Sequence, residues 1–199
     1  AVPGVPTLIG SYDTPGYALN VAIAGDVAYV ADYASGLLLF DVSDPSAPAI
    51  LGSRLTPSNA MGVAISGDVA YVADYASGLL LVDVSDSSAP TLIGSCDTPD
   101  CALGVTTAGD VAYVADSSSG LQLIDISDPG TPMPLGSYDT PGAALGVAIS
   151  GDVAYVADRS TGLQLIDISK PSAPTLLSSW DTTGLAYGVA ISGDIAYVA

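Results

Sequence analysis

The chain has 199 residues, enough for one domain with a sizeable core, and 49% of them are hydrophobic. All 21 acidic residues are aspartate, there is no histidine, and the formal net charge is −18, which excludes histidine-based catalytic or metal sites and disfavours a phosphate backbone as partner. No apolar run approaches the roughly 20 residues of a membrane-spanning helix, so neither nucleic acid nor membrane insertion is predicted.

The sequence is an array of repeats with a period of 42 residues. The string GDVAYVAD begins at Gly25 and returns 42 residues later each time, at Gly67, Gly109 and Gly151, with a last copy at Gly193. A proline that opens PTLIGS or a variant keeps the same period, from Pro6 to Pro174. A fixed period of this length indicates stacked repeats rather than an ordinary globular fold.

Each repeat is predicted to form four short strands and no helix. In chain order, the first copy gives residues 8–14, 18–24, 27–32 and 37–42 as strands. Gly25-Asp26 is typical of a tight hairpin turn, and Pro45 and Pro48 end the fourth segment because proline cannot donate a ladder hydrogen bond.

The strands at 27–32 and 37–42 are apolar on both faces, so both faces of each sheet must be covered. Repeats of about 40 to 45 residues with four antiparallel strands each predict an all-β fold, a β-propeller. Residues 18–24 would form the innermost strand of a blade, and residues 50–56 the outermost. The whole chain, 1–199, is one propeller domain of about 4.7 repeats in this interpretation.

The segments that follow YVAD carry a family resemblance. They read GLLLFDVSDP, GLLLVDVSD, GLQLIDISDP and GLQLIDISKP, and with them the chain resembles the LVIVD repeat family of bacterial and archaeal β-propellers. The resemblance covers essentially the whole chain. It implies the propeller fold and says almost nothing of function.

The innermost strand is built from small residues, because blades converge at the axis. One position holds Gly62, Gly104, Gly146 and Gly188, with Asn20 in the first copy. Asparagine is the residue that best replaces glycine in left-handed backbone, so the substitution predicts a left-handed conformation there.

Most of the recurring aspartates are predicted to serve turns. Asp26 and its equivalents follow glycine in a hairpin, and Asp41 and Asp44 stand beside the Ser-Pro loop, where an aspartate bonds its own backbone. The equivalent of Asp44 in the fourth copy is Lys170, which a required ligand position would not tolerate.

Two further sets of aspartates are predicted to share one face of the propeller and to form its ligand-binding face together with two tyrosines. The residues are Asp13, Asp32, Tyr33, Asp74, Tyr75, Asp97, Asp116, Asp139, Asp158 and Asp181. Their oxygen atoms would suit Ca²⁺, but no calcium-loop motif is present, and the same groups would suit a sugar. No cofactor and no metal site is therefore assigned.

Tyrosine is the dominant aromatic residue, with 11 copies. Tyr29 and its four equivalents recur in the second strand, which predicts packing between blades. Irregularly placed tyrosines in or beside the loops of the acidic face could contact a ligand: Tyr17, Tyr33, Tyr75 and Tyr187.

Both cysteines, Cys96 and Cys101, fall in one copy, across a short turn. The spacing predicts a local disulfide with the two Cα atoms within about 7 Å, and an oxidising compartment. The scarcity of lysine and the lack of glutamate also favour an extracellular or cell-surface location.

The last copy of the repeat stops inside its second strand. It therefore has no third strand with which the strand at 8–14 could pair to complete the last blade. A closed ring formed by these residues alone is therefore not expected; we expect part of a longer array, with six to eight blades or so, or a ring that a partner completes.

Two functions are compatible with this sequence. One is a non-catalytic extracellular or cell-surface module for binding or scaffolding, with a protein, the rest of a repeat array or a glycan as partner. The other is a metal-dependent propeller hydrolase or lyase that uses the acidic loops. We favour the first, because a catalytic site breaks repeat symmetry with unusual residues and the departures from symmetry here are mild.

Overall fold

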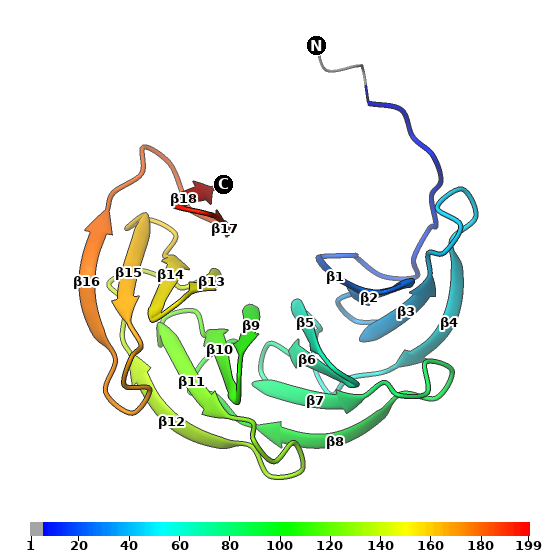
Figure 1. Cartoon of the computed structure of the whole chain (residues 1–199), viewed down its shortest axis with the longest axis horizontal. Coiled ribbons are helices and arrows are strands. Elements are labelled where there is room, and N and C mark those ends of the chain that lie inside the picture. The colour runs from blue at the N-terminus through cyan, green and yellow to red at the C-terminus, as the bar shows by residue number, and fades with distance from the viewer. Residues whose placement is uncertain (1–5) are drawn as a thin grey trace.

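The computed structural model describes residues 6–199, in which every regular element is a β-strand. Four antiparallel sheets of four strands and a final sheet of two strands stand side by side along an open arc (Figure 1). Within the described residues, no helix is available that could cross a membrane. The all-β propeller architecture predicted from the repeat is confirmed.

The strands follow one another along the chain, four to a blade. Blade 1 contains β1 (Asn20–Ala24), β2 (Val27–Ala31), β3 (Leu37–Asp41) and β4 (Ala49–Arg54). Blade 2 contains β5 (Gly62–Ser66), β6 (Val69–Ala73), β7 (Leu79–Asp83) and β8 (Thr91–Cys96). Blade 3 contains β9 (Gly104–Ala108), β10 (Val111–Ala115), β11 (Leu121–Asp125) and β12 (Met133–Tyr138). Blade 4 contains β13 (Gly146–Ser150), β14 (Val153–Ala157), β15 (Leu163–Asp167) and β16 (Thr175–Trp180), and blade 5 has β17 (Val189–Ser192) and β18 (Ile195–Val198).

In every complete blade the first strand lies innermost and the fourth outermost, as the sequence predicts (Figure 1). The first two strands of each blade are joined by a two-residue Gly-Asp turn, as the pairing of Ala24 with Val27 shows in blade 1. Gly25 has a φ of 57°, which glycine adopts without steric cost.

The expected strand at residues 8–14 is not formed. The segment lies against blade 1 as β4 lies against blade 2. A Cβ on Gly10 would lie 2.2 Å from the carbonyl oxygen of Pro45 in blade 1. At the equivalent position of β4, a Cβ on Gly52 would lie 2.3 Å from the carbonyl oxygen of Ser87 in blade 2. Since no third strand lies beside the segment at 8–14, its backbone has no ladder partner and remains irregular.

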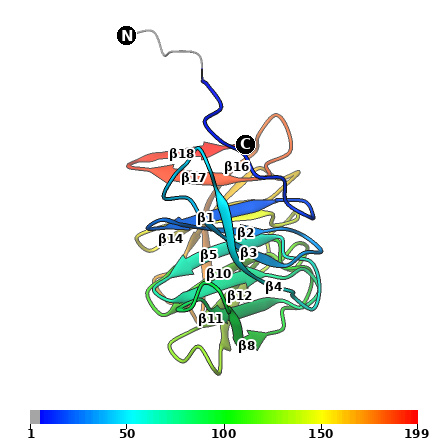
Figure 2. The same cartoon turned by 90° about the vertical axis from the view of Figure 1, so that its right-hand side faces the viewer.

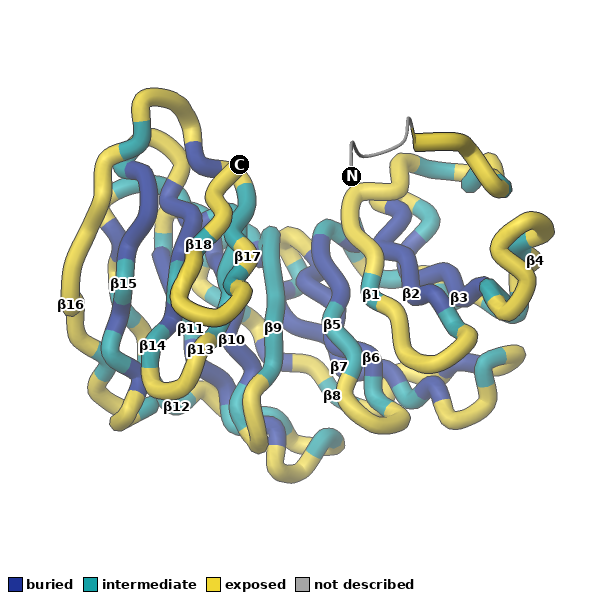
Figure 3. Tube along the Cα trace, turned by 45° about the horizontal axis from the view of Figure 1, so that its top comes forward, coloured by how far each residue is buried: buried dark blue, intermediate teal, exposed yellow. Residues whose placement is uncertain are grey.

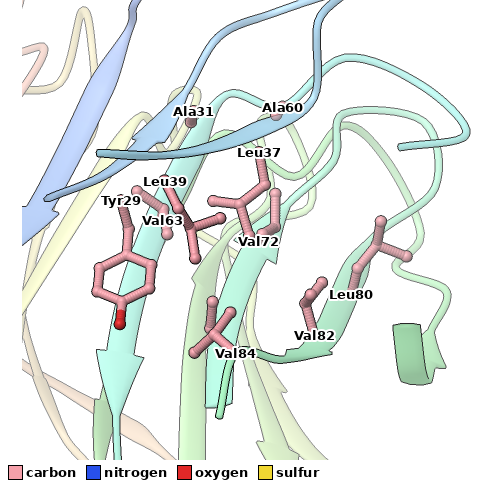
Figure 4. Packing of buried hydrophobic residues seen from close by; sticks show 11 residues of the cluster. Tyr29, Ala31, Leu37, Leu39, Ala60, Val63, Val72, Leu80, Val82 and Val84 are labelled. Atoms are coloured by element: carbon pink, nitrogen blue, oxygen red, sulfur yellow. The ribbon is translucent and has the colours of Figure 1, made fainter. Parts of the chain in front are cut away.

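Apolar side chains from facing sheets form a separate core at each blade junction. Between blades 1 and 2, Tyr29 and Leu39 of one sheet pack with Val63 and Val72 of the next (Figure 4). Tyr29 is 6% exposed, and its equivalents Tyr71 and Tyr113 occupy the next two cores. The prediction that the recurring tyrosines serve packing between blades is confirmed for these three.

The small residues of the innermost strands lie where neighbouring blades converge, as predicted, but the left-handed conformation expected at the Asn20 position is wrong. Neither Asn20 nor Gly62 has a positive φ. Instead, a Cβ on Gly62 would lie 2.9 Å from the carbonyl oxygen of Leu103 in the next blade, so these positions are small because neighbouring backbones approach closely. Asn20 accepts a hydrogen bond from the amide of Val63 through its Oδ1 (3.2 Å), which ties blade 1 to blade 2.

The arc is open, and the two ends of the described chain lie at its opening (Figure 1, Figure 2). Burial is greatest in the middle strands of blades 1 to 4 and falls off in blade 5, where β18 is mostly exposed (Figure 3). Tyr197 of β18 is 56% exposed, although its equivalents in blades 1 to 3 are buried. The described residues therefore form no closed ring, as expected.

Candidate binding face

The loops that follow the second strand of each blade and the loops that lead into the first strand lie on the same side of the arc. In blade 1, the hydroxyl of Thr14 donates to Asp32 Oδ1 (2.7 Å), which joins the two loops. On the opposite side, the amide of Val42 donates to the carbonyl of Asp26 (2.8 Å). The loops that carry the two further sets of aspartates thus share one face, as predicted, and we call it the aspartate face.

Four of the predicted site carboxyl groups on this face are buried. They belong to the aspartate that ends the GDVAYVAD string: Asp32, Asp74, Asp116 and Asp158, each 0% exposed. In Asp158, Oδ1 accepts from the hydroxyl of Thr140 (2.6 Å) and Oδ2 from the amide of Gly142 (2.8 Å). These groups fasten the linker from the preceding blade and do not reach the surface.

Asp74 is the exception among the four. Its Oδ2 accepts from the amide of Ser58 (2.8 Å), but its Oδ1 and the neighbouring Thr56 hydroxyl have no partner within hydrogen-bond geometry among the described residues. Burial raises the pKa of Asp74, and the nearby Thr56 hydroxyl, the amide of Ser58 and the Ser77 hydroxyl limit the rise. Burial also raises the pKa of Asp116.

The second predicted set is exposed. Asp13, Asp97, Asp139 and Asp181 lie in the linkers between blades. The structure does not gather them with the buried set: no group of three or more His, Cys, Asp or Glu side chains that could hold a metal ion occurs between residues 6 and 199. A ligand-binding role for the ten residues stays a prediction, and the geometry gives the buried and the exposed carboxyl groups separate environments.

The tyrosines of the face are held in unusual backbone conformations. Tyr33 and Tyr75 have φ values of 50° and 47°, in the left-handed region that non-glycine residues seldom occupy. The conformation arises because each residue closes the loop after the second strand while its N–H and C=O pair with an alanine of the next blade, Tyr33 with Ala60 at 3.0 Å in both directions. Ser117 and Arg159 hold the same position in blades 3 and 4.

A third exposed tyrosine of this face, Tyr17, lies beside Tyr33, and we call the set Tyr17, Tyr33 and Tyr75 the tyrosine row. Tyr17 and Tyr33 lie edge to face with their ring centroids 6.0 Å apart, and Tyr17 is 72% exposed. The thiol of Cys101 stands beside the Tyr75 hydroxyl and raises the pKa of that tyrosine. The left-handed position could have been found from the sequence, since it falls directly after each buried aspartate and varies among tyrosine, serine and arginine from blade to blade.

The predicted disulfide is not formed, because Cys96 and Cys101 are both free. Cys96 ends strand β8 and is packed into the core between blades 2 and 3, whereas Cys101 lies in the linker beside Tyr75. The two thiols thus have separate surroundings. Burial raises the pKa of the Cys96 thiol, which therefore stays neutral.

The sequence analysis missed the threonines that bind the buried aspartates. Thr14, Thr98 and Thr140 each lie 18 residues before their aspartate and donate to it at 2.6 to 2.7 Å. Their signal in the sequence is the Thr-Pro pair that opens each of these linkers.

The sequence of the repeat matches a known protein family. The LVIVD repeat matches residues 15–56, 57–98, 101–140, 141–182 and 183–199. The chain belongs to the LVIVD repeat family. No curated protein matches this LVIVD chain.

Solved structures similar to the LVIVD chain show the same fold. A functionally unknown protein from Desulfotomaculum acetoxidans DSM 771 is 17% identical, with a TM-score of 0.79 over 98% of this chain and 67% of that one. The computationally designed Ika8 protein is 10% identical, with a TM-score of 0.72 over 89% of this chain and 54% of that one. The designed Ika4 protein is 11% identical, with a TM-score of 0.60 over 72% of this chain and 86% of that one. The chain thus spans about half the length of the designed Ika8 protein.

Proposed function

We propose that this LVIVD propeller is a non-catalytic binding module, placed outside the cell or at its surface, that holds a protein or glycan partner on its aspartate face. The observation that carries the proposal is the exposed tyrosine row formed by Tyr17, Tyr33 and Tyr75. The location rests on composition: three basic residues, no glutamate and no histidine.

The variation among the repeats supports binding at this row. The Gly-Asp turn and the second strand with its closing aspartate, residues 25–32, are identical in the four complete blades. The left-handed position, in contrast, holds tyrosine in two blades, serine in one and arginine in one. A strained backbone that positions exposed, blade-specific side chains is typical of a functional surface.

Tyrosine side chains suit recognition without chemistry. They supply a large, rigid contact area with few rotatable bonds and a polar hydroxyl, and they are enriched in interfaces. The chain also carries a net charge of −18, so a partner surface rich in lysine or arginine would be attracted to it and could place a cation over a tyrosine ring.

The alternative, a metal-dependent hydrolase or lyase, receives less support from the geometry. Such a site needs several carboxylate oxygens that face a common ligand. The oxygens of Asp116 and Asp158 are used to fasten linkers, and Asp74 Oδ1 is a single buried oxygen.

The test replaces two tyrosines at once. Tyr33→Asn with Tyr75→Asn removes both rings and keeps a residue that tolerates left-handed backbone. Arg159→Asn is the matched control, because it makes the same change at the same position of blade 4. The variants are screened on an oligosaccharide array and on an array of extracellular protein domains.

We expect the partner bound by the wild-type chain to be lost by the double variant and kept by Arg159→Asn. A partner that binds the wild-type chain and the double variant equally would place the site elsewhere and contradict the proposal.

A further inference from the structure

A cavity of about 330 Å³ lies between blades 2 and 3, near the outer rim. On the blade 2 side it is lined by Cys96 at the end of β8 and by the linker residues that follow, Asp97, Thr98 and Pro99. On the blade 3 side, Leu123 and Ile124 of β11 and Pro134 of β12 form an apolar wall, with Gln122 beside them. The volume falls in the range of small-molecule sites, roughly 300 to 1,000 Å³.

The repeat explains why the cavity occurs at this junction. The position of Cys96 holds a large side chain in every other copy: Tyr12, Arg54, Tyr138 and Trp180. Cysteine is the one small residue among them, so the space that a ring takes elsewhere stays open here.

Two other copies of the repeat show how an aromatic ring sits at this position. Tyr12 packs edge to face on Phe40, the blade 1 equivalent of Ile124, with ring centroids 4.8 Å apart. Tyr138 is half-buried against the core between blades 3 and 4, which contains Ile166, the next equivalent of Ile124. The protein therefore twice places a phenol ring where the junction of blades 2 and 3 has a cavity.

The polar groups around the cavity select the charge of an occupant. The Thr98 hydroxyl donates to Asp116 (2.6 Å) and is already used. Gln122 donates through Nε2 to the carbonyl of Ser119 (2.6 Å), which leaves its Oε1 as a hydrogen-bond acceptor. The exposed Asp97 carboxyl group and the acidic chain disfavour an anion, and the buried Cys96 thiol behaves as a small hydrophobic group.

We propose that this cavity is a binding site for a small, uncharged, monocyclic aromatic compound of the phenol class. The ring would lie between Cys96 and Ile124, as the rings of Tyr12 and Tyr138 lie at their own junctions, and the hydroxyl would donate to Gln122. An apolar cavity of roughly 150 Å³ is enough to hold a benzene ring, so this one has room for the ring and its substituents. The site is separate from the tyrosine row and extends the proposed function.

The first test is a calorimetric titration with p-cresol. The wild-type chain, Cys96→Ala and the control Cys101→Ala, which changes the thiol outside the cavity, are expected to bind one molecule each. Cys96→Tyr fills the cavity with a side chain the repeat already uses there, and we expect at least a tenfold loss of affinity. No binding to the wild-type chain, or equal binding by Cys96→Tyr, would overturn the proposal.

A second measurement does not depend on the tyrosine variant. In Cys101→Ala protein, p-cresol is expected to slow the reaction of Cys96 with a maleimide, because the ring covers the thiol. Cyclohexanol, of similar size but not aromatic, and p-hydroxybenzenesulfonate, which carries a charge, should protect at least tenfold less well at equal concentration. Equal protection by either compound, or none by p-cresol, would contradict the assigned ligand class.

Discussion

At the scale of single residues, the buried aspartates show how one motif serves the same purpose with different local chemistry. Asp158 accepts hydrogen bonds from Thr140 and Gly142, so its negative charge is stabilised by donors on both oxygens. In Asp74, Oδ1 has no partner within hydrogen-bond geometry, and burial raises the pKa of both Asp74 and Asp116. Because a buried charge is costly, both carboxyl groups should contribute to the pH dependence of stability, and the contribution of Asp74 can be tested by itself.

The pH dependence of stability should carry the signature of Asp74. Burial raises the pKa of Asp74 in the folded chain above its unfolded value, which is about 4. At a pH between these two values, the folded chain binds more protons than the unfolded chain. The free energy of unfolding from this group therefore falls as pH rises through that window. Asp74→Asn removes the titration while its amide oxygen can still accept from Ser58, and we expect a flatter curve in urea unfolding from pH 4 to 7.

Asp41→Asn is the matched control for that series. The hydroxyl and amide of Ser43 lower the pKa of Asp41 in the folded chain. The contribution of Asp41 to stability is therefore complete when the pH is above the ordinary aspartate pKa, and it is lost only as the pH falls through the lowered folded pKa. The slope above pH 4 should be that of the wild-type chain. An unchanged slope in Asp74→Asn would contradict the role assigned to Asp74.

The left-handed residues store strain that a substitution can release. Arg159 has a φ of 41° and is exposed. Left-handed backbone costs a residue with a Cβ about 1 to 2 kcal/mol, and replacement by glycine removes this cost. The greater conformational freedom of glycine in the unfolded chain offsets a part of the gain. We expect Arg159→Gly to raise the free energy of unfolding by about 0.5 to 1 kcal/mol in chemical denaturation.

Ser160→Gly provides the comparison, because Ser160 is exposed, adjacent and without a positive φ. It gains only unfolded-state freedom, so its free energy of unfolding should fall by about 0.5 to 1 kcal/mol. If Arg159→Gly and Ser160→Gly both lowered the free energy of unfolding, the backbone at residue 159 would not be strained.

At the scale of elements, the outer strands carry a glycine wherever another blade follows closely. A Cβ on Gly94 in β8 would lie 2.1 Å from the carbonyl oxygen of Pro129 in blade 3, and one on Gly136 in β12 would lie 2.3 Å from that of Pro171. The equivalent residue in β16 is Ser178, which is exposed. The glycines of β8 and β12 thus leave room for a loop of the next blade.

This contrast predicts opposite tolerance at two equivalent positions. Gly94→Ala should lower the free energy of unfolding by roughly 3 kcal/mol, because the backbone of blade 3 must move away. Ser178→Ala should change it by less than about 0.5 kcal/mol, as surface substitutions do. Thermal unfolding of both variants measures the difference, and a well-tolerated Gly94→Ala would argue against the close blade contact.

At the scale of the whole molecule, the open arc leaves blade faces without a neighbour. Val21 and Ile23 of β1, which face away from blade 2, are 58% and 64% exposed, while their equivalents Val63 and Ile65 pack into the core between blades 1 and 2. At the other end, Ile195 and Tyr197 of β18 are exposed. Large exposed apolar patches of this kind favour association.

The 199-residue chain is therefore expected to self-associate as its concentration rises. Replacing Val21 and Ile23 with lysine should weaken the association, because the charged groups remain solvated on an exposed face. Sedimentation velocity over a series of concentrations measures the change. Ser66→Lys, on an exposed residue at the end of β5, is the control and should leave association as it is. A wild-type chain that stays monomeric throughout would contradict the expectation.

The sequence by itself determined the period, the four strands of each blade, their inner-to-outer order and the division of loops between two faces. These follow from local chemistry: Gly-Asp turns, prolines that end strands and apolar residues on both faces of the middle strands need no distant partner to be interpreted. The tertiary structure was needed to show which carboxyl groups are buried, that Asn20 has no left-handed backbone, that residues 8–14 form no strand, and that Cys96 borders a cavity. Each of these depends on what an adjacent blade places a few ångströms away, and neighbouring blades are 42 residues distant along the chain, beyond the reach of any local pattern.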